Sequence, residues 1–120
     1  MWVTQEPVNH RIALGRSGED RAAEWYTRHG YEIVERNWCS HIGEVDLVCA
    51  RDDILVFCEV KTRCSDRLGS PAEAVTPAKQ LRLRRLASEY IYRHTCGGHQ
   101  PRFDVVAILG RSLTVIEDAF

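Results

Sequence analysis

The stretch GEVDLVCARDDILVFCEVK, which runs from Gly43 to Lys61, decides both the fold class and the candidate site. Two apolar runs, interrupted only by Asp46 in the first and Glu59 in the second, flank a polar turn, and this pattern predicts an antiparallel β-hairpin. If Asp52-Asp53 is a two-residue loop, the register puts Asp46 directly opposite Glu59. A three-residue loop would turn Asp46 to the other face, so the predicted site depends on this register.

The two acids form an unfavourable pair if folding alone is considered. Residues that face each other across a ladder have Cβ atoms about 4.5–5.5 Å apart, and like charges there are destabilising. Side chains alternate along a strand, so Lys61 shares the face of Glu59. A lone Glu-x-Lys on a strand is usually a solvated edge, but Asp46 in the matching register makes the pattern more specific. Two carboxylates and an amine together predict a divalent-cation site, because magnesium prefers hard oxygen ligands.

Length and composition are those of one globular domain. The chain has 120 residues, 44% apolar and 28% charged, and its net charge of −1 neither favours nor excludes nucleic acid as a partner. No stretch approaches the ~20 apolar residues that span a membrane, and residues 1–10 lack the apolar segment of a signal peptide. We expect a cytoplasmic protein, no membrane association and no zinc site. The five cysteines, odd in number and without ligand spacing, are expected to be reduced: Cys39, Cys49, Cys58, Cys64 and Cys96.

The segments on either side of the hairpin predict an α/β sandwich, in which helices flank a mixed five-stranded sheet. Residues 1–11 contain Pro7 and no clear period, so we expect a loose N-terminal arm before a single domain at 12–120. Thr76-Pro77 is a strong helix start, an N-cap followed by proline at N1. The expected order is a helix at 12–29, strands at 31–38, 44–50 and 54–62, a helix at 77–94, and strands at 102–109 and 113–117.

One acid lies on the apolar stripe of the first predicted helix. Glu19 shares this stripe with Ala22 and Tyr26, although glutamates are rarely buried without a partner. Glu19 could lie at the margin of the stripe or pair with a buried arginine. Together with the hairpin acids, it is interpreted as the third member of an acidic cluster. Glycine costs ~1 kcal/mol inside a helix, so the helix could begin only at Ser17 or Gly18.

These residue types suit phosphodiester hydrolysis. Asp46 and Glu59, with the Val60 carbonyl, would hold one Mg²⁺, with Mn²⁺ as an alternative ion. A metal held in this way polarises a scissile phosphate and lowers the pKa of a bound water. Lys61 would orient the attacking water and offset the developing charge. Glu19 would bind a metal-coordinated water or a second metal.

The same residues match a known pattern. Asp46 followed by Glu59-Val60-Lys61 resembles the PD-(D/E)xK nuclease signature, and a preceding helical glutamate resembles the archaeal Holliday-junction resolvases of that superfamily. More closely, the chain from about residue 12 to its end resembles the YraN-like family of uncharacterised bacterial proteins, with Val45 and Cys58 where isoleucine and valine are usual. The resemblance implies a restriction-endonuclease-like fold and active-site roles for Glu19, Asp46, Glu59 and Lys61. The matching stretches are Gly15-x-x-Gly18-Glu19-x-x-Ala22-Ala23, Gly30-Tyr31, Asn37, Gly43-Glu44-Val45-Asp46-Leu47-Val48, Val56-Phe57-Cys58-Glu59-Val60-Lys61-Thr62-Arg63, Lys79, Arg102-Phe103-Asp104-Val105-Val106 and Ala119-Phe120.

A local basic cluster follows the hairpin. Contacts to a phosphate backbone need lysines and arginines. Charge runs on helices are more often solvated faces, but beside the acidic site we interpret this one as a nucleic-acid surface. It comprises Arg63 and Arg67 in the loop at 63–75 and Lys79, Arg82 and Arg85 in the helix that follows.

The sequence therefore favours a Mg²⁺-dependent endonuclease acting on DNA, with branched structures among the candidate substrates. Two alternatives stay open. One is a nucleic-acid-binding module without hydrolysis, and the other is a protein-interaction domain on a nuclease-like fold. A homodimer is also compatible with this interpretation, because two copies would supply two active sites for symmetric cutting.

Overall fold

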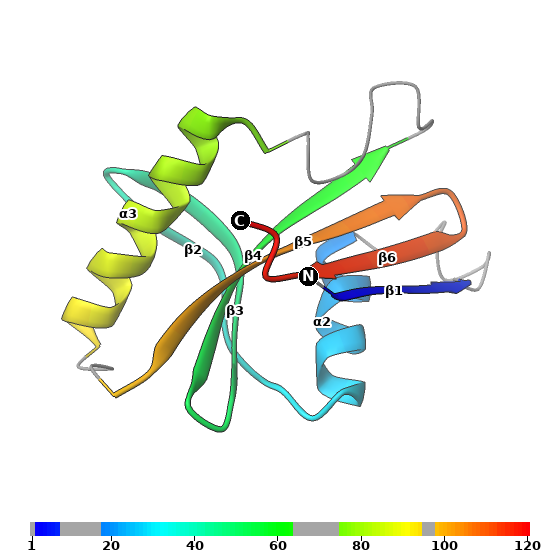
Figure 1. Ribbon diagram of the computed structural model, residues 1–120, viewed down its shortest axis with the longest axis horizontal. Coiled ribbons are helices and arrows are strands. Elements are labelled where there is room, and N and C mark those ends of the chain that lie inside the picture. Colours follow the sequence, from blue (N-terminus) through cyan, green and yellow to red (C-terminus); the bar gives the residue numbers. More distant parts are fainter. Residues whose placement is uncertain (1, 8–17, 64–74, 95–97) are drawn as a thin grey trace.

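A mixed six-stranded sheet forms the centre of the fold, with the strand order β1-β6-β5-β4-β3-β2 (Figure 1). The computed structural model describes residues 2–7, 18–63, 75–94 and 98–120. Strands β4 and β5 run parallel, and the other neighbouring strands are antiparallel. The elements are β1 (Trp2–Pro7), α2 (Gly18–Arg28), β2 (Glu32–Ser40), β3 (Gly43–Arg51), β4 (Ile54–Arg63), α3 (Pro77–Arg93), β5 (Gln100–Leu109) and β6 (Ser112–Glu117).

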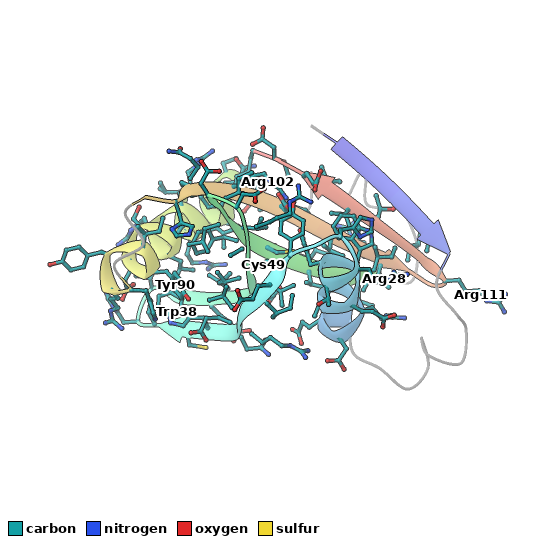
Figure 2. The ribbon with its side chains drawn as sticks, turned by 90° about the horizontal axis from the view of Figure 1, so that it is seen from below. Arg28, Trp38, Cys49, Tyr90, Arg102 and Arg111 are labelled. Carbon is teal, nitrogen blue, oxygen red and sulfur yellow. The ribbon has the colours of Figure 1, made fainter. Side chains whose placement is uncertain are left out.

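The two helices cover opposite faces of this sheet (Figure 1). On one face Tyr26 of α2 packs into a core that includes Cys58 of β4. On the other face Tyr90 of α3 packs against Phe57, the residue before Cys58, with ring centroids 5.8 Å apart. Trp38 of β2 lies beside Tyr90 (Figure 2), with an edge-to-face distance of 5.1 Å. The predicted α/β sandwich is therefore confirmed.

Local sequence signals set the helix ends. Thr76 caps α3 by accepting a hydrogen bond from the main-chain N–H of Lys79, and Pro77 occupies the first turn, as predicted. Gly30 follows α2 with a φ of +85°, a conformation that favours glycine. The described part of α2 spans Gly18–Arg28. The predicted helical residues 12–17 lie outside the described part of the chain.

The N-terminal segment differs from the prediction. The sequence predicts a loose arm over residues 1–11 and five strands, but Trp2–Pro7 form β1 and pair antiparallel with β6, from Trp2↔Glu117 to Pro7↔Ser112. A short strand without strong alternation gains its order from the unpaired main-chain groups of the sheet edge, which local periodicity does not reveal. Pro7 stands at the end of the strand, where the missing N–H is tolerated.

The described cysteines are free thiols, as the sequence predicts. Cys49 and Cys58 are buried free thiols in the core, and Cys39 is an exposed free thiol. Cys64 and Cys96 lie outside the described residues. Within the described ranges, neither helix combines the length and apolar character needed to cross a membrane.

Candidate active site

Asp46 lies where the two strands of the hairpin part. The predicted register is confirmed, with β3 and β4 paired around the two-residue turn as far as Leu47↔Cys58. Beyond this pair β3 stays with β2 while β4 stays with β5. Asp46 is the next residue, and its Oδ2 accepts a hydrogen bond from the Val60 main-chain N–H at 2.8 Å. The carboxylate therefore occupies the opening between the strands, next in register to Glu59.

A break in the side-chain alternation of β3 accompanies this opening. Residues two apart on a strand normally share a face, yet Val45 packs on the α3 side and Leu47 on the α2 side. Asn37, which stands across from Asp46 on β2, has a φ of +52°. Non-glycine residues in this conformation are uncommon, and asparagine is among those that tolerate it. Irregular backbone next to Asp46 thus turns its side chain toward β4.

Glu59 and Lys61 lie together on the α3 face of β4. The Lys61 Nζ is 3.2 Å from the Glu59 Oε1, and both side chains are only about a quarter exposed, at 26% and 21%. Phe57 precedes them on the same face and is fully buried. The apolar face of β4 therefore ends in this ion pair, as the alternation predicts.

Helix α2 carries Glu19 to the same place from the other face. The start of α2 approaches β4 so closely that a Cβ on Gly18 would lie 2.5 Å from the Thr62 Oγ1, so only glycine fits. Glu19 follows directly, and its charge helps to raise the pKa of Asp46. The structure thus brings together the four predicted residues: Glu19, Asp46, Glu59 and Lys61.

Excess negative charge marks this cluster. The pKa of Asp46 is raised to about 6, chiefly by burial and in addition by the charges of Glu59, Glu19 and Glu44, against the lowering effect of the Val60 hydrogen bond. A carboxyl with a raised pKa is destabilised in its charged form. A cation or a cationic ligand between these oxygens would relieve that cost.

Basic side chains from α3 border the acids. A shallow depression between β3, β4 and α3 is lined by Glu44, Glu59, Val75, Lys79, Arg82, Leu83 and Leu86. Burial lowers the pKa of Lys61, but the hydrogen bond to Glu59 and the charges of Glu59 and Asp46 act in the opposite direction, and the net shift is upward. The neighbouring charge of Lys61 lowers the pKa of Lys79. Arg82 passes over Gly43, where a Cβ would lie 3.2 Å from the Arg82 Cδ.

The donor set suits magnesium shared with a substrate. Among the described residues no three His, Cys, Asp or Glu side chains form a complete metal cage. Magnesium, however, is commonly bound by one or two carboxylates together with waters and substrate phosphates. Asp46 and Glu59 provide two carboxylates at neighbouring register positions, and after burial the charge of Glu59 contributes to the raised pKa of Asp46.

The predicted nucleic-acid residues separate into groups. Lys79 and Arg82 border the acids, and Arg85 is exposed on the next turn of α3. Arg63 ends β4, and its Nη1 is buried without a hydrogen-bond partner among the described residues. Arg67 lies outside the described residues.

Sequence comparison places the chain in a family. The sequence model of the uncharacterised protein family UPF0102 matches residues 18–108, which include all four clustered residues. The chain belongs to the UPF0102 family. This assignment agrees with the resemblance to YraN-like proteins. The family's description gives no activity, so membership supplies the family alone.

Relatives in the UPF0102 family match most of this chain. A UPF0102 protein of Rhodococcus jostii (strain RHA1) is 55% identical over 100 residues, which cover 83% of this chain and 85% of the relative. One from Rhodococcus opacus (strain B4) is 53% identical with the same coverage. One from Streptomyces coelicolor is 46% identical over 118 residues, covering 93% of this chain and 89% of the relative.

One acid of the site has no role in the sequence prediction. Glu44 lines the depression, and its charge helps to raise the pKa of Asp46. Its position two residues before Asp46 is the signal that could have found it, because residues at i and i+2 share a face in a regular strand. The break of alternation in β3 could not be foreseen from that spacing.

Proposed function

We propose that this protein is a metal-dependent nuclease that hydrolyses phosphodiester bonds of DNA. The observation that carries the proposal is the convergence of Glu19, Asp46, Glu59 and Lys61 at the point where β3 and β4 part, beside a basic helix. Folding alone does not favour three acids around one half-buried carboxylate. Groups whose pKa is shifted by burial and charge gather at functional sites.

Each side chain has a role that its position allows. Asp46 and Glu59, with the Val60 carbonyl, are the groups that would hold Mg²⁺ or Mn²⁺. When bound, such a metal polarises the scissile phosphate and acidifies a water. Lys61 is held by Glu59 at 3.2 Å, so its ammonium group points into the site and can offset charge on the phosphate. Glu19 would order a water at the α2 side.

The basic turn of α3 favours a polyanionic substrate. Lys79, Arg82 and Arg85 face the site or follow it on the exposed side of α3. Phosphate backbones bind such residues through charge and counterion release, without reading sequence. DNA, including branched DNA, is the substrate class that we propose.

The test is cleavage of a labelled panel of duplex, flap, fork, four-way junction and single-stranded DNA with Mg²⁺ or Mn²⁺. Lys61→Ala and Glu59→Gln are expected to lower the cleavage rate about 10²-fold or more, because each removes a charged group at the reacting phosphate. Glu32→Gln, which alters an exposed glutamate at the hairpin end of β2, is the matched control. Cleavage that survives EDTA, or that Lys61→Ala leaves intact, would assign the activity to another site or a contaminant.

A non-catalytic nucleic-acid-binding module is the second candidate. The observation that favours it is the incomplete side-chain cage among the described residues, in which Lys61 already pairs with one of the two carboxylates. Under this alternative, binding to the panel would be tight without metal, and no cleavage would occur in either metal.

A further inference from the structure

The chain has only two lysines, and the fold brings them together. Lys61 and Lys79 stand against fourteen arginines in 120 residues. They come from different elements, β4 and the first turn of α3, and both lie beside Glu59. The Lys61 Nζ is 3.2 Å from the Glu59 Oε1, and Lys79 lines the same depression as Glu59. Lysine carries a compact point charge with three donors, whereas arginine presents a planar fork. Both lysines of the chain therefore lie in this one region of the fold.

This arrangement is unfavourable for the protein on its own. Two ammonium groups beside one carboxylate repel each other, and among the described residues it is Lys61 that forms the ion pair, with its Nζ 3.2 Å from the Glu59 Oε1. Lys79 is also the third residue of α3, close to the positive end of the helix dipole. After an N-cap threonine, glutamate or glutamine at this position would complete a capping box. Lys79 is therefore unfavourable for stability in two ways, through repulsion from Lys61 and through its place at the positive end of the helix dipole.

We infer that Lys61 and Lys79 together bind a single phosphate group, which their two ammonium groups hold from β4 and from α3. The inference rests on the proposed function for the source of that phosphate, which is the nucleic-acid backbone. It adds Lys79 as a positioning residue for the phosphate that Lys61 contacts. An anion between the two lysines replaces their repulsion by two charge-assisted hydrogen bonds.

The neighbouring residues fix where this phosphate lies. Glu59 stands on one side of Lys61 and marks the predicted metal position. Arg82 lies one helical turn beyond Lys79 on the same side of α3, and Gly43 leaves room for its side chain. The phosphate therefore sits between the acids and the basic helix, and Arg82 is placed for the next phosphate along the strand.

The scarcity of lysine allows a direct test. Protein labelled with ¹³C and ¹⁵N only in lysine gives two side-chain NMR signals. Inorganic phosphate is titrated first, against sodium chloride of equal ionic strength, and a short DNA duplex second, both in EDTA. Both lysine signals are expected to move with phosphate and with DNA, and the remaining signal in Lys79→Ala or Lys61→Ala is expected to respond more weakly. Two signals that stay still with both ligands would overturn the inference, whatever the protein cleaves.

Salt dependence distinguishes one shared phosphate from two separate ones. Each neutralised duplex phosphate contributes about 0.9 to the slope of log affinity against log salt. If one phosphate is shared, the double Ala variant loses about 0.9 of slope and each single variant less. Separate phosphates would give additive losses of about 1.8 in the double variant, and that result would overturn the inference. Arg93→Ala, about 21 Å further along α3, is the matched control and should keep the slope.

The same titrations distinguish failure of this inference from failure of the proposed function. Lysine signals that move with phosphate but not with DNA would keep the anion position and remove nucleic acid as its ligand. Thermal unfolding of each variant accompanies the titrations. Should Lys61→Ala fail to fold, Lys79→Ala alone, with Lys61 as the reporter, still decides whether the anion site needs both lysines.

Discussion

Two charged clusters, one around Asp104 and one around Asp46 and Glu59, differ in how fully neighbouring groups of the protein balance their charges. Asp104, fully buried on the α2 face, accepts hydrogen bonds from the Tyr26 hydroxyl at 2.6 Å, the Asp118 main-chain N–H at 3.1 Å, and the Arg102 Nε and Nη2 at 2.9 and 2.8 Å. Arg102 also donates to Glu117 at 3.3 Å (labelled in Figure 2). Every oxygen of this buried carboxylate is occupied by the protein itself.

The candidate site on the other side is not balanced in this way. Asp46 accepts one main-chain hydrogen bond, while burial and the charges of three acids raise its pKa. Lys61 and Lys79 both lie beside Glu59 although both are cations. Buried polar groups of a folded protein are normally satisfied, and the half-buried Asp46 carboxylate has less compensation than Asp104. The first cluster serves the fold, whereas we propose that the second binds a metal and a phosphate.

The largest effect is expected from breaking the compensated cluster. Asp104→Ala removes the buried carboxylate that Arg102 contacts at 2.8 and 2.9 Å and leaves Arg102 with the more distant Glu117 as its carboxylate partner, so we expect the free energy of unfolding to fall by about 3–5 kcal/mol. Urea denaturation measures it. Glu59→Gln, on the opposite face, is the comparison variant and should change stability by less than about 1 kcal/mol. Equal losses in the two variants would remove the distinction between the clusters.

A smaller gain of stability is expected at Asp46. Its folded pKa of about 6 lies above the unfolded value of 3.8, so the folded state binds the extra proton between these values and stability falls as pH rises through that window. Asp46→Asn keeps an acceptor for the Val60 N–H without the charge. It should be more stable than wild type by about 2 kcal/mol above pH ~6.5, after solvent screening, and equal to it below pH ~4.

The pH series needs a control that removes a carboxylate elsewhere. Asp53→Asn, on the exposed turn between β3 and β4, should stay within about 0.5 kcal/mol of wild type at every pH. If Asp46→Asn showed the same small, pH-independent difference, Asp46 would not be the strained group of the site.

Binding of Mg²⁺ should offset part of the destabilisation caused by the charged Asp46 carboxylate. With free Mg²⁺ at tenfold its dissociation constant, mass action raises the free energy of unfolding by about 1.4 kcal/mol. The melting temperature should rise accordingly, EDTA should reverse the shift, and Asp46→Asn should not respond. A shift of equal size in Asp46→Asn would place the metal elsewhere.

The hairpin could be predicted from sequence because its determinants are local. The turn at Asp52-Asp53 fixes the register, with Asp52 at a φ of +54° as such two-residue turns require, and alternation then places Glu59 and Lys61 on one face. The Thr76 cap and the end of α2 at Gly30 are equally local.

What could not be predicted depends on contacts distant in sequence. Asp104 shares a strand face with Arg102, but its Tyr26 partner lies 78 residues away. The burial of Asp46 depends on β4 leaving β3 and on the irregular backbone at Asn37. The placement of Lys79 beside Glu59 and Lys61 depends on how α3 docks. Strand β1 takes its order from β6, and its nearest pair in sequence, Pro7↔Ser112, is 105 residues apart.

The smallest effect tests whether Lys79 is placed for function or for the fold. Lys79 stands in the first turn of α3 and Arg93 in the last, where it also pairs with Glu89 at 3.3 Å. A cation is unfavourable at the first position and favourable at the second. Lys79→Gln should therefore stabilise the protein by about 0.3–0.5 kcal/mol at low salt, and Arg93→Gln should destabilise it by a similar amount.

Both differences should fade as salt approaches 1 M, because exposed charges are then screened within about 3 Å. Thermal unfolding at low and high salt measures them on one helix with one type of substitution. If Lys79→Gln instead lowered stability, Lys79 would contribute to the fold through Glu59, and its place beside Lys61 would need no ligand. A gain in stability together with weaker phosphate binding is the combination that only a functional position produces.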